Sequence, residues 1–277
     1  MTKIKSIKTI QTEIDGTSFL SEYLEYNDDN ELTLSIKYDA DGNVIEKIEN
    51  IYEDGKKVTE KNHISEDELA EEHHFEYDTD GKLKTERIHY AEGYSAIRNV
   101  IRDKNKGELR IEEVDENGEI EEYTVQQYDE NDKMTEKAEY DHRGKLVSAV
   151  RLTYNDKGQV VVQEEYEKKM KKPVRIREYS YTENGDIESM IVKNHKRKVI
   201  DRFVLEYDDK GHLLKQQSAQ AGIISREYEG DLLKKETHTN AAGNIIAQTE
   251  YDYDEHGNVI KESNDMVKKT YEIQYFD

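Results

Sequence analysis

One seven-residue pattern recurs along most of the chain and constrains its fold more than any other feature. It consists of Tyr, then Asp or Asn, two variable residues, Gly, one variable residue and an aliphatic residue. The stretch 139–161, EYDHRGKLVSAVRLTYNDKGQVV, contains it twice, beginning at Tyr140 and Tyr154. Variants of the pattern begin at eleven positions: Tyr26, Tyr38, Tyr77, Val114, Tyr128, Tyr140, Tyr154, Tyr181, Tyr207, Thr239 and Tyr253.

The fifth position of the pattern predicts a tight turn. It is Gly in nine copies, and Asn30 and Asp132 take its place in the other two. Asn and Asp are the non-glycine residues that best tolerate a positive φ angle, so this position is expected to be left-handed. A type I turn followed by a left-handed residue that makes a bulge is a common β-hairpin connection. The Asp or Asn after the tyrosine is expected to accept a hydrogen bond from the backbone two residues later.

The segments between these turns alternate as β-strands do. In 146–154, Leu146, Val150 and Tyr154 share one face with Ser148 and Leu152, and the intervening residues point the other way. Copies follow each other at intervals of twelve or fourteen residues where the repeat is cleanest, which leaves about eight or nine residues for each strand. This spacing predicts an antiparallel meander of about twenty strands.

Three segments interrupt the repeat, and one of them, 91–107, is expected to be less regular around Gly93 and Gly107. Ser65 and Glu68 have the spacing of a capping box, which predicts a short helix or helical loop within 64–74. The segment 167–175 holds the single proline, Pro173, and a local group of basic residues, and it is expected to be an exposed hairpin end.

The composition favours a thin sheet over a packed sandwich. Apolar residues make up 34% of the 277 residues, and the chain has no Trp and four Phe to fill a space between two layers. Disorder is the alternative at this composition, but 20 Tyr, one Pro and a regular pattern oppose it. We therefore predict an all-β fold, a long antiparallel β-hairpin meander that forms an extended, twisted or curved and mostly single-layer sheet. A rolled or closed barrel-like sheet is the alternative, because sheets beyond about ten strands tend to curl or split.

The repeats are predicted to build one β domain over residues 1–277. Within it, 1–25 is expected to be a less regular N-terminal segment, and 26–277 holds the hairpin repeats. No Ser-, Gly- or Pro-rich linker divides the chain.

The recurring pattern resembles the YD repeats of Rhs-type bacterial proteins and teneurins, over most of 26–277. The resemblance implies β-hairpin sheets, which in those families spiral into large shells that often surround a toxic C-terminal domain. The chain departs from the Rhs pattern, because no Rhs-like core motif ends its repeats and no separate C-terminal domain follows them. The arginine that often follows the glycine in Rhs repeats is also absent; the residues found there are Asn43, Lys82, Glu119, Lys145, Gln159, Asp186, His212, Asn244 and Asn258. The resemblance therefore indicates a β-hairpin repeat protein and not an encapsulated toxin.

Charge and cysteine content bound the partners and the location. The net charge of −22 disfavours nucleic acid, whose binding depends on Lys and Arg, and it would steer basic proteins toward the surface. The chain has no Cys, no apolar signal segment near its start and no stretch of 18 apolar residues that predicts membrane insertion. A cytoplasmic protein is expected if Met1 is the native start, and a secreted or surface protein if a signal was removed.

The sequence contains no motif that indicates an enzyme, a metal or a cofactor. Walker A, dinucleotide-binding, nucleophile-elbow and HExxH patterns are missing, and a thiol nucleophile is excluded. The oxygen-rich segments 39–43 and 78–81 lack the further ligands of an EF-hand, so they are interpreted as turns. His73 and His74 are adjacent, and neighbouring side chains on a strand point to opposite faces.

Two sets of residues are candidates for binding. Tyr128, Tyr140 and Tyr154 could form an aromatic stripe suited to a sugar or peptide, although packing against cross-strand neighbours is the favoured interpretation. An acidic segment could dock a basic protein, although solvated charge on exposed strands is the ordinary interpretation. Its residues are Glu112, Glu113, Asp115, Glu116, Glu119, Glu121 and Glu122.

We therefore expect a non-enzymatic protein that presents an acidic β-surface to a basic protein partner. Its most concrete form is an immunity or chaperone-like protein for a bacterial toxin or effector. The alternative is a surface or secreted structural repeat module that binds envelope or carbohydrate material. Self-association through exposed sheet edges is a further expectation.

Overall fold

A computed structural model describes residues 2–168 and 170–276, and this part of the chain is entirely β-strands and connections. Its twenty-two strands confirm the predicted antiparallel hairpin meander. The chain forms two compact units. Unit 1 comprises Met1–Ser95, Arg226–Thr237 and Ile246–Asp277, and unit 2 comprises Ala96–Ser225 and His238–Ile245.

Unit 1 carries the strands from both ends of the chain. Successive strands pair antiparallel from β1 to β7 and again from β20 to β22. The strands of this unit are β1 (Ile4–Glu13), β2 (Ser18–Tyr26), β3 (Leu32–Tyr38), β4 (Val44–Glu53), β5 (Lys56–His63), β6 (Leu69–Tyr77), β7 (Leu83–Tyr90), most of β19 (Leu232–Thr239), most of β20 (Ile245–Tyr253), β21 (Val259–Ser263) and β22 (Val267–Tyr275). Residues 1–25, which were expected to be less regular, contain β1 and most of β2.

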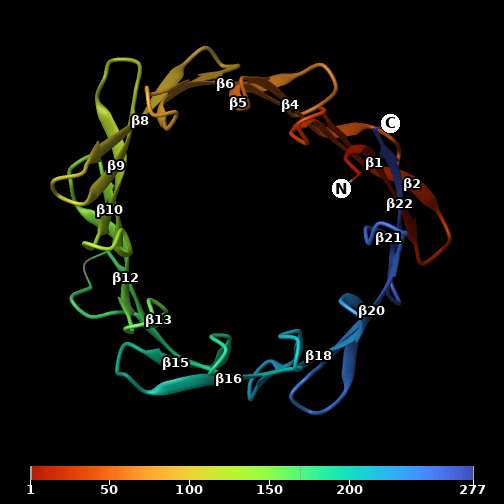
Figure 1. The fold of residues 1–277 in the computed structure, drawn as a ribbon. Coiled ribbons are helices and arrows are strands. Elements are labelled where there is room, and N and C mark those ends of the chain that lie inside the picture. The colour runs from red at the N-terminus through yellow and green to blue at the C-terminus, as the bar shows by residue number, and fades with distance from the viewer. Residues whose placement is uncertain (1, 169, 277) are drawn as a thin grey trace. The chain divides into compact units, whose positions relative to one another are not determined.

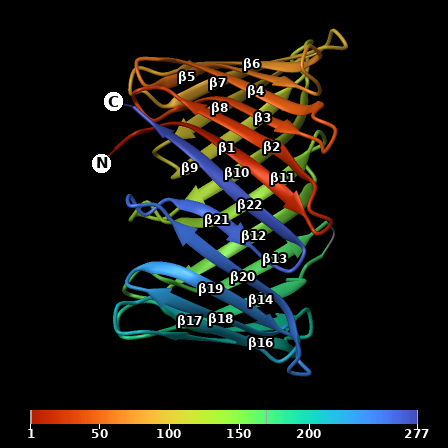
Figure 2. The same cartoon turned by 90° about the vertical axis from the view of Figure 1, so that its right-hand side faces the viewer.

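The first and last strands of the chain pair with each other. β1 lies between β2 and β22 (Figure 2), and its ladder with β22 runs from Ile4, opposite Tyr275, to Glu13, opposite Val267. An open sheet would leave β1 and β22 as edge strands. The pairing therefore matches the rolled or closed alternative rather than the open sheet.

Unit 2 holds an uninterrupted meander from β8 to β18, which Figure 1 shows as a single layer of strands from yellow-green to cyan. Its strands are most of β8 (Ser95–Asp103), β9 (Glu108–Val114), β10 (Ile120–Tyr128), β11 (Met134–Asp141), β12 (Leu146–Tyr154), β13 (Val160–Glu167), β14 (Arg175–Tyr181), β15 (Ile187–Asn194), β16 (Val199–Tyr207), β17 (Leu213–Ser218) and the first half of β18 (Gly222–Glu229), whose residues from Arg226 onward belong to unit 1. The predicted hairpin end at 167–175 connects β13 to β14.

The repeated turn has the geometry that the sequence predicts. At 39–43, Asp39 Oδ1 accepts hydrogen bonds from the backbone N–H groups of Asp41 and Asn43, at 3.0 and 2.8 Å. Gly42 has a φ of 85°, and the substitutes Asn30 and Asp132 have φ angles of 64° and 58°. The ladder shifts by one residue where the following strand begins, as expected for a bulge.

The tyrosine of the repeat has a structural role that the pattern alone did not show. The Tyr154 hydroxyl donates to the backbone carbonyl of Met134, at 2.6 Å, where the neighbouring strand begins. Equivalent bonds, each spanning 20 or 21 residues, join Tyr52 to Leu32, Tyr77 to Lys57, Tyr181 to Val160, Tyr207 to Ile187 and Tyr253 to Leu233. These hydroxyls satisfy carbonyl groups beside the bulges, where the ladder is interrupted.

The predicted helix at 64–74 is wrong. Residues 64–68 form a turn in which the Ile64 N–H donates to the Glu68 carbonyl at 3.0 Å, and β6 follows from Leu69. The same five-residue closure occurs at 39–43, so this loop is a hairpin turn without the glycine. Ser65 and Glu68 matched a helix start by spacing, but the alternation of the following residues lets them pair with β5 and β7.

Only a few apolar side chains are buried in the described residues. Ile88 and Ile176 are 2% and 1% exposed, and Ala138 and Ala149 lie opposite each other on β11 and β12. Ile176 lies between Glu164 and Lys193 on the adjacent strands. Long charged side chains cover apolar surface with their aliphatic stems, which supports a thin sheet that lacks a second layer.

Candidate functional site

A hollow of about 240 Å³ opens on one face of unit 2, and we call it the acidic hollow. It is smaller than the usual range of small-molecule pockets, roughly 300–1,000 Å³. Four strands and the start of β12 contribute to it. The lining residues are Arg98, Ile111, Glu113, Glu122, Tyr123, Thr124, Glu139, Tyr140 and Val147.

Strand register brings a row of charged residues to this face. Arg98 on β8 lies opposite Glu113 on β9, and Glu113 lies opposite Glu122 on β10. Glu122 in turn lies opposite Asp141 at the end of β11. Like charges directly opposite each other on a sheet are destabilising, so this row opposes folding unless cations compensate for it.

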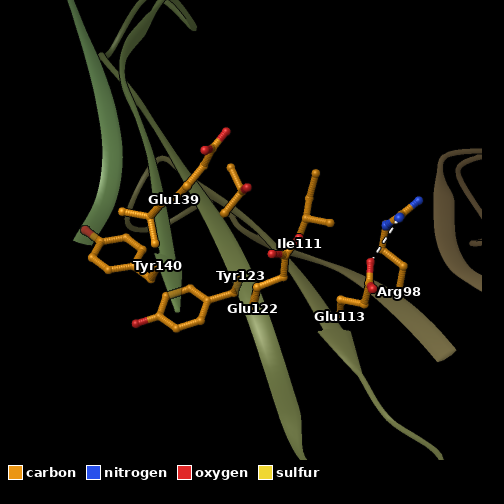
Figure 3. Close-up of a pocket in the computed structure, with 9 residues that line it drawn as sticks. Arg98, Ile111, Glu113, Glu122, Tyr123, Glu139 and Tyr140 are labelled. Carbon is orange, nitrogen blue, oxygen red and sulfur yellow. Dashed lines mark hydrogen bonds and ion pairs between the residues drawn. The ribbon is translucent and has the colours of Figure 1, made fainter. Parts of the chain in front are cut away.

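The row has one arginine partner on this face. Arg98 Nη2 donates to Glu113 Oε2 at 3.0 Å, and Figure 3 shows this pair at one end of the hollow. Glu122 is exposed. The carboxylate of Asp141 accepts hydrogen bonds from the Arg143 and Lys145 backbone, of which the Lys145 bond is the stronger influence, and they lower the pKa of Asp141.

The next row supplies both an apolar floor and a third glutamate. Ile111 lies opposite Thr124, and Thr124 lies opposite Glu139. Glu139 Oε2 accepts a hydrogen bond from Ser148 at 2.7 Å, and Val147 is 40% exposed beside it. The hollow thus joins three carboxylates and one guanidinium to a small apolar surface.

A stack of side chains that includes two lining residues of the hollow, Tyr123 and Tyr140, joins the same strands. The rings of Tyr123 and Tyr140 are stacked with centroids 4.8 Å apart, as Figure 3 shows, and the Arg110 guanidinium lies 3.9 Å from the Tyr123 centroid. Arg110 Nε also donates to Glu112 at 2.6 Å. Such stacking is worth roughly 0.5–1.5 kcal/mol beyond area burial, and it holds β9, β10 and β11 in register.

The structure divides the seven predicted acidic residues among different positions. Glu113 and Glu122 line the acidic hollow, and Glu112 lies on the opposite face with Arg110. Asp115 closes the β9–β10 turn, where hydrogen bonds from the Glu119 backbone and the Asn117 side chain lower its pKa. The remaining three, Glu116, Glu119 and Glu121, are exposed in or beside that turn.

The three predicted stripe tyrosines do not lie together. Tyr128 and Tyr154 precede turns at one end of the strands, whereas Tyr140 is near the other end and stacks on Tyr123. The Tyr128 hydroxyl donates to Gln126 at 2.6 Å, and that of Tyr154 donates to the Met134 carbonyl.

Arg98, Thr124 and Glu139 were missed as site residues. The position of Glu139 could have been predicted by counting residues along both strands from the β10–β11 turn. Thr124 and Glu139 are opposite each other once the one-residue bulge beside the turn is counted. The position of Arg98 could not have been predicted in this way, because its pairing with Glu113 depends on the turn at 104–107, which does not follow the repeated pattern.

Within 2–168 and 170–276, no group of three or more His, Cys, Asp or Glu side chains is placed to hold a metal ion. The same residues include no helix that is long and apolar enough to cross a membrane.

Comparisons with known proteins give only distant likenesses. No protein-family model matches the chain, and no curated protein matches it. A chain of the TcdB2-TccC3-Cdc42 crystal structure matches 92% of this chain and 18% of its own, with 12% identity and a TM-score of 0.43. TcdB2-TccC3 without its hypervariable C-terminal region matches 95% of this chain and 18% of its own, at 13% identity and a TM-score of 0.34.

A porin-like protein from Bacteroides uniformis matches 99% of both chains, at 10% identity and a TM-score of 0.33. This chain spans less than a fifth of the toxin-complex chains. Because these TM-scores are all below 0.5, the likenesses carry no argument about family or function.

Proposed function

We propose that the protein is a non-enzymatic binding protein whose acidic hollow receives a basic side chain of a protein partner. The observation that carries the proposal is the placement of Glu113 directly opposite Glu122, with Glu139 in the next row and Arg98 as the only basic residue in the lining. A lysine or arginine from a partner would relieve the repulsion within this row. Sites that oppose local stability in this way are often functional.

The size and lining of the hollow favour a side chain over a free cofactor. Its volume is below the usual range for small-molecule pockets. Ile111 and Val147 offer apolar contact to the aliphatic stem of a lysine or arginine, while the carboxylates face its charged end. The net charge of −22 would speed the approach of a basic partner, and salt would slow it.

An immunity or chaperone-like role toward a basic toxin or effector is the most concrete form of this proposal. It is supported by the resemblance of the repeats to YD repeats and by the charge of the chain. The partner-facing surface would then extend from the hollow to the exposed Glu116, Glu119 and Glu121.

The test is affinity capture with a matched control. The immobilised protein is exposed to lysate of its source organism at low and high salt, in parallel with Glu122→Gln/Glu139→Gln. The control, Glu130→Gln/Glu183→Gln, removes the same charge from exposed turns elsewhere in unit 2. We expect one basic protein to bind with a Kd below about 10 μM, equivalent to roughly −7 kcal/mol. Glu122→Gln/Glu139→Gln should no longer bind this protein, and the control variant should still bind it.

Equal losses in the two variants, or no protein partner at this affinity, would contradict the proposal. Retention of polysaccharide or envelope material in place of a protein would support the alternative, a structural repeat module of the cell surface.

A further inference from the structure

Three loops of unit 2 concentrate positive charge in an otherwise acidic protein. They connect β11 to β12, β13 to β14, and β15 to β16. We call their lysines and arginines the basic turn cluster: Arg143, Lys145, Lys168, Lys171, Lys172, Lys196, Arg197 and Lys198. The described loop residues, 142–145, 168, 170–174 and 195–198, include no Asp or Glu.

The hairpin topology places these loops together, although they are far apart in sequence. Strands β11 to β16 are successively antiparallel, so every second connection lies at the same end of the strands. Neighbouring loops of the cluster are two strands apart, or roughly 10 Å. Lys168 also contacts Asp141 of β11 at 3.6 Å, and Arg197 contacts Glu164 of β13 at 3.5 Å, so each of these two loops reaches a strand two positions away in the sheet.

The opposite end of the same strands has a different character. The turns at 129–133, 155–159 and 182–186 each include at least one acidic residue, and two of them carry net negative charge. Among the turns that join β11 to β16, net positive charge is therefore confined to one end of the strands, although the neighbouring turn at that end, 115–119, is acidic.

The cluster combines exposed cations with exposed apolar side chains. All eight of its Lys and Arg residues are exposed. Met170, between the lysines of the second loop, is 44% exposed. Val199 and Ile200, directly after the third loop, are 47% and 39% exposed.

We propose that the basic turn cluster is a docking surface for an anionic phospholipid membrane, to which the protein binds peripherally. Lys and Arg near a membrane surface are attracted by its negative potential, and apolar side chains among them enter the boundary between headgroups and acyl chains. The three loops offer both kinds of group at one end of the strands. This surface adjoins the acidic hollow at Asp141, which lies opposite Glu122 and contacts Lys168, but it is made of different side chains, and the inference does not depend on the proposed function.

A lipid surface fits these observations better than a nucleic acid. The described residues of the three loops include no Phe, Tyr or Trp on which a base could stack, and His142 and His195 are their only aromatic rings. Exposed Met, Val and Ile side chains gain nothing from phosphate contacts, whereas they stabilise contact with acyl chains.

Vesicle sedimentation tests the proposal with the full chain. We expect the protein to sediment with phosphatidylcholine vesicles that contain phosphatidylserine and not with pure phosphatidylcholine, and to be released by high salt. Lys171→Glu/Lys172→Glu and Lys196→Glu/Lys198→Glu should each weaken vesicle binding by about tenfold or more. Met170→Ser should weaken it severalfold without changing the salt dependence.

The matched control is Lys104→Glu/Lys157→Glu, which makes the same charge change in turns at the opposite end of the strands. It should retain vesicle binding within about twofold, since it lies more than a Debye length from the bound surface. Circular dichroism confirms that each variant keeps its strands. The proposal is overturned if phosphatidylserine has no effect, if the control loses as much as the cluster variants, or if the cluster binds a DNA duplex and not the vesicles.

Discussion

At the scale of single residues, the protein replaces core packing with specific polar contacts. Few side chains are fully buried, and the tyrosine hydroxyls bond to carbonyl groups at the starts of neighbouring strands. Buried carbonyls without a donor are costly, so these hydroxyls supply stability that a thicker protein would take from apolar contacts.

Removing one hydroxyl tests this role. Tyr154→Phe keeps the ring and removes the 2.6 Å bond to the Met134 carbonyl. We expect the free energy of unfolding, measured by urea titration, to fall by about 1 kcal/mol. Tyr94→Phe is the control, because Tyr94 is 52% exposed in a turn. An equal effect in the two variants would contradict the structural role of the repeat tyrosine.

His73 is expected to make the stability of the fold depend on pH. Its Nδ1 lies 2.7 Å from Glu86 Oε1 and its Nε2 lies 3.2 Å from Glu71 Oε1, so both nitrogens must carry protons to serve as donors. Glu60 lies opposite His73 on β5, and Ile88 lies opposite it on β7. The hydrogen bond to Glu86, with a smaller contribution from Glu71, raises the pKa of His73 despite its burial.

Because the folded pKa of His73 is above its ordinary value, its stabilisation is complete below about pH 6.5 and is lost as the pH rises through the folded value. His73→Gln should therefore lower the free energy of unfolding most at low pH, and progressively less above about pH 6.5. Urea titrations of both proteins across this range check the expectation, with His195→Gln as a variant in an exposed turn. A cost that does not change with pH would show that the imidazolium is not the stabilising form.

At the scale of elements, the turn and its following bulge are the unit that builds the sheet. Each turn of the repeat closes with the same pair of backbone hydrogen bonds, and Asn30 and Asp132 adopt the left-handed conformation of the glycines they replace. The direction of each strand and the end at which each loop lies follow from these turns.

Substitutions at Gly42 distinguish the effect of backbone strain from that of steric crowding. Its φ is 85°, and a Cβ atom at this position would have no neighbour within 4 Å. Gly42→Ala should therefore destabilise the protein by about 1–2 kcal/mol through the backbone alone. Gly42→Asn adds a larger side chain to the same open space, and it should cost less because Asn tolerates this conformation. Thermal unfolding compares the stabilities of the two variants. A larger loss of stability in Gly42→Asn than in Gly42→Ala would contradict the account of the turn.

Local patterns predicted the elements well but not the contacts between distant elements. The turn chemistry and the alternation of residues are local, so the strands could be derived from them. The pattern at Ser65 and Glu68 was ambiguous, because a capping box and a hairpin turn use the same residue types. The acidic hollow depends on the register of several strands, and each bulge changes which face a residue takes.

At the scale of the whole molecule, the chain joins its first strand to its last. The ladder between β1 and β22 uses backbone groups that would otherwise be exposed on two edge strands. These strands therefore offer their hydrogen-bonding groups to each other, which removes the simplest route to edge-to-edge association. Charge is likewise arranged by topology, because the acidic hollow and the basic turn cluster each gather residues from several hairpins.

The pairing of β1 with β22 is the central claim of this account, and a disulfide tests it directly. Lys8 lies opposite Glu272, and the native chain has no Cys, so Lys8→Cys/Glu272→Cys introduces a single defined pair. Opposed Cα atoms on antiparallel strands are within the range that a disulfide spans. The control, Lys8→Cys/Lys268→Cys, is off register by four residues, or roughly 13 Å. After mild oxidation and denaturing electrophoresis, the account predicts an intramolecular disulfide in the first variant and none in the control. Equal yields in the two variants, or only intermolecular disulfides, would contradict it.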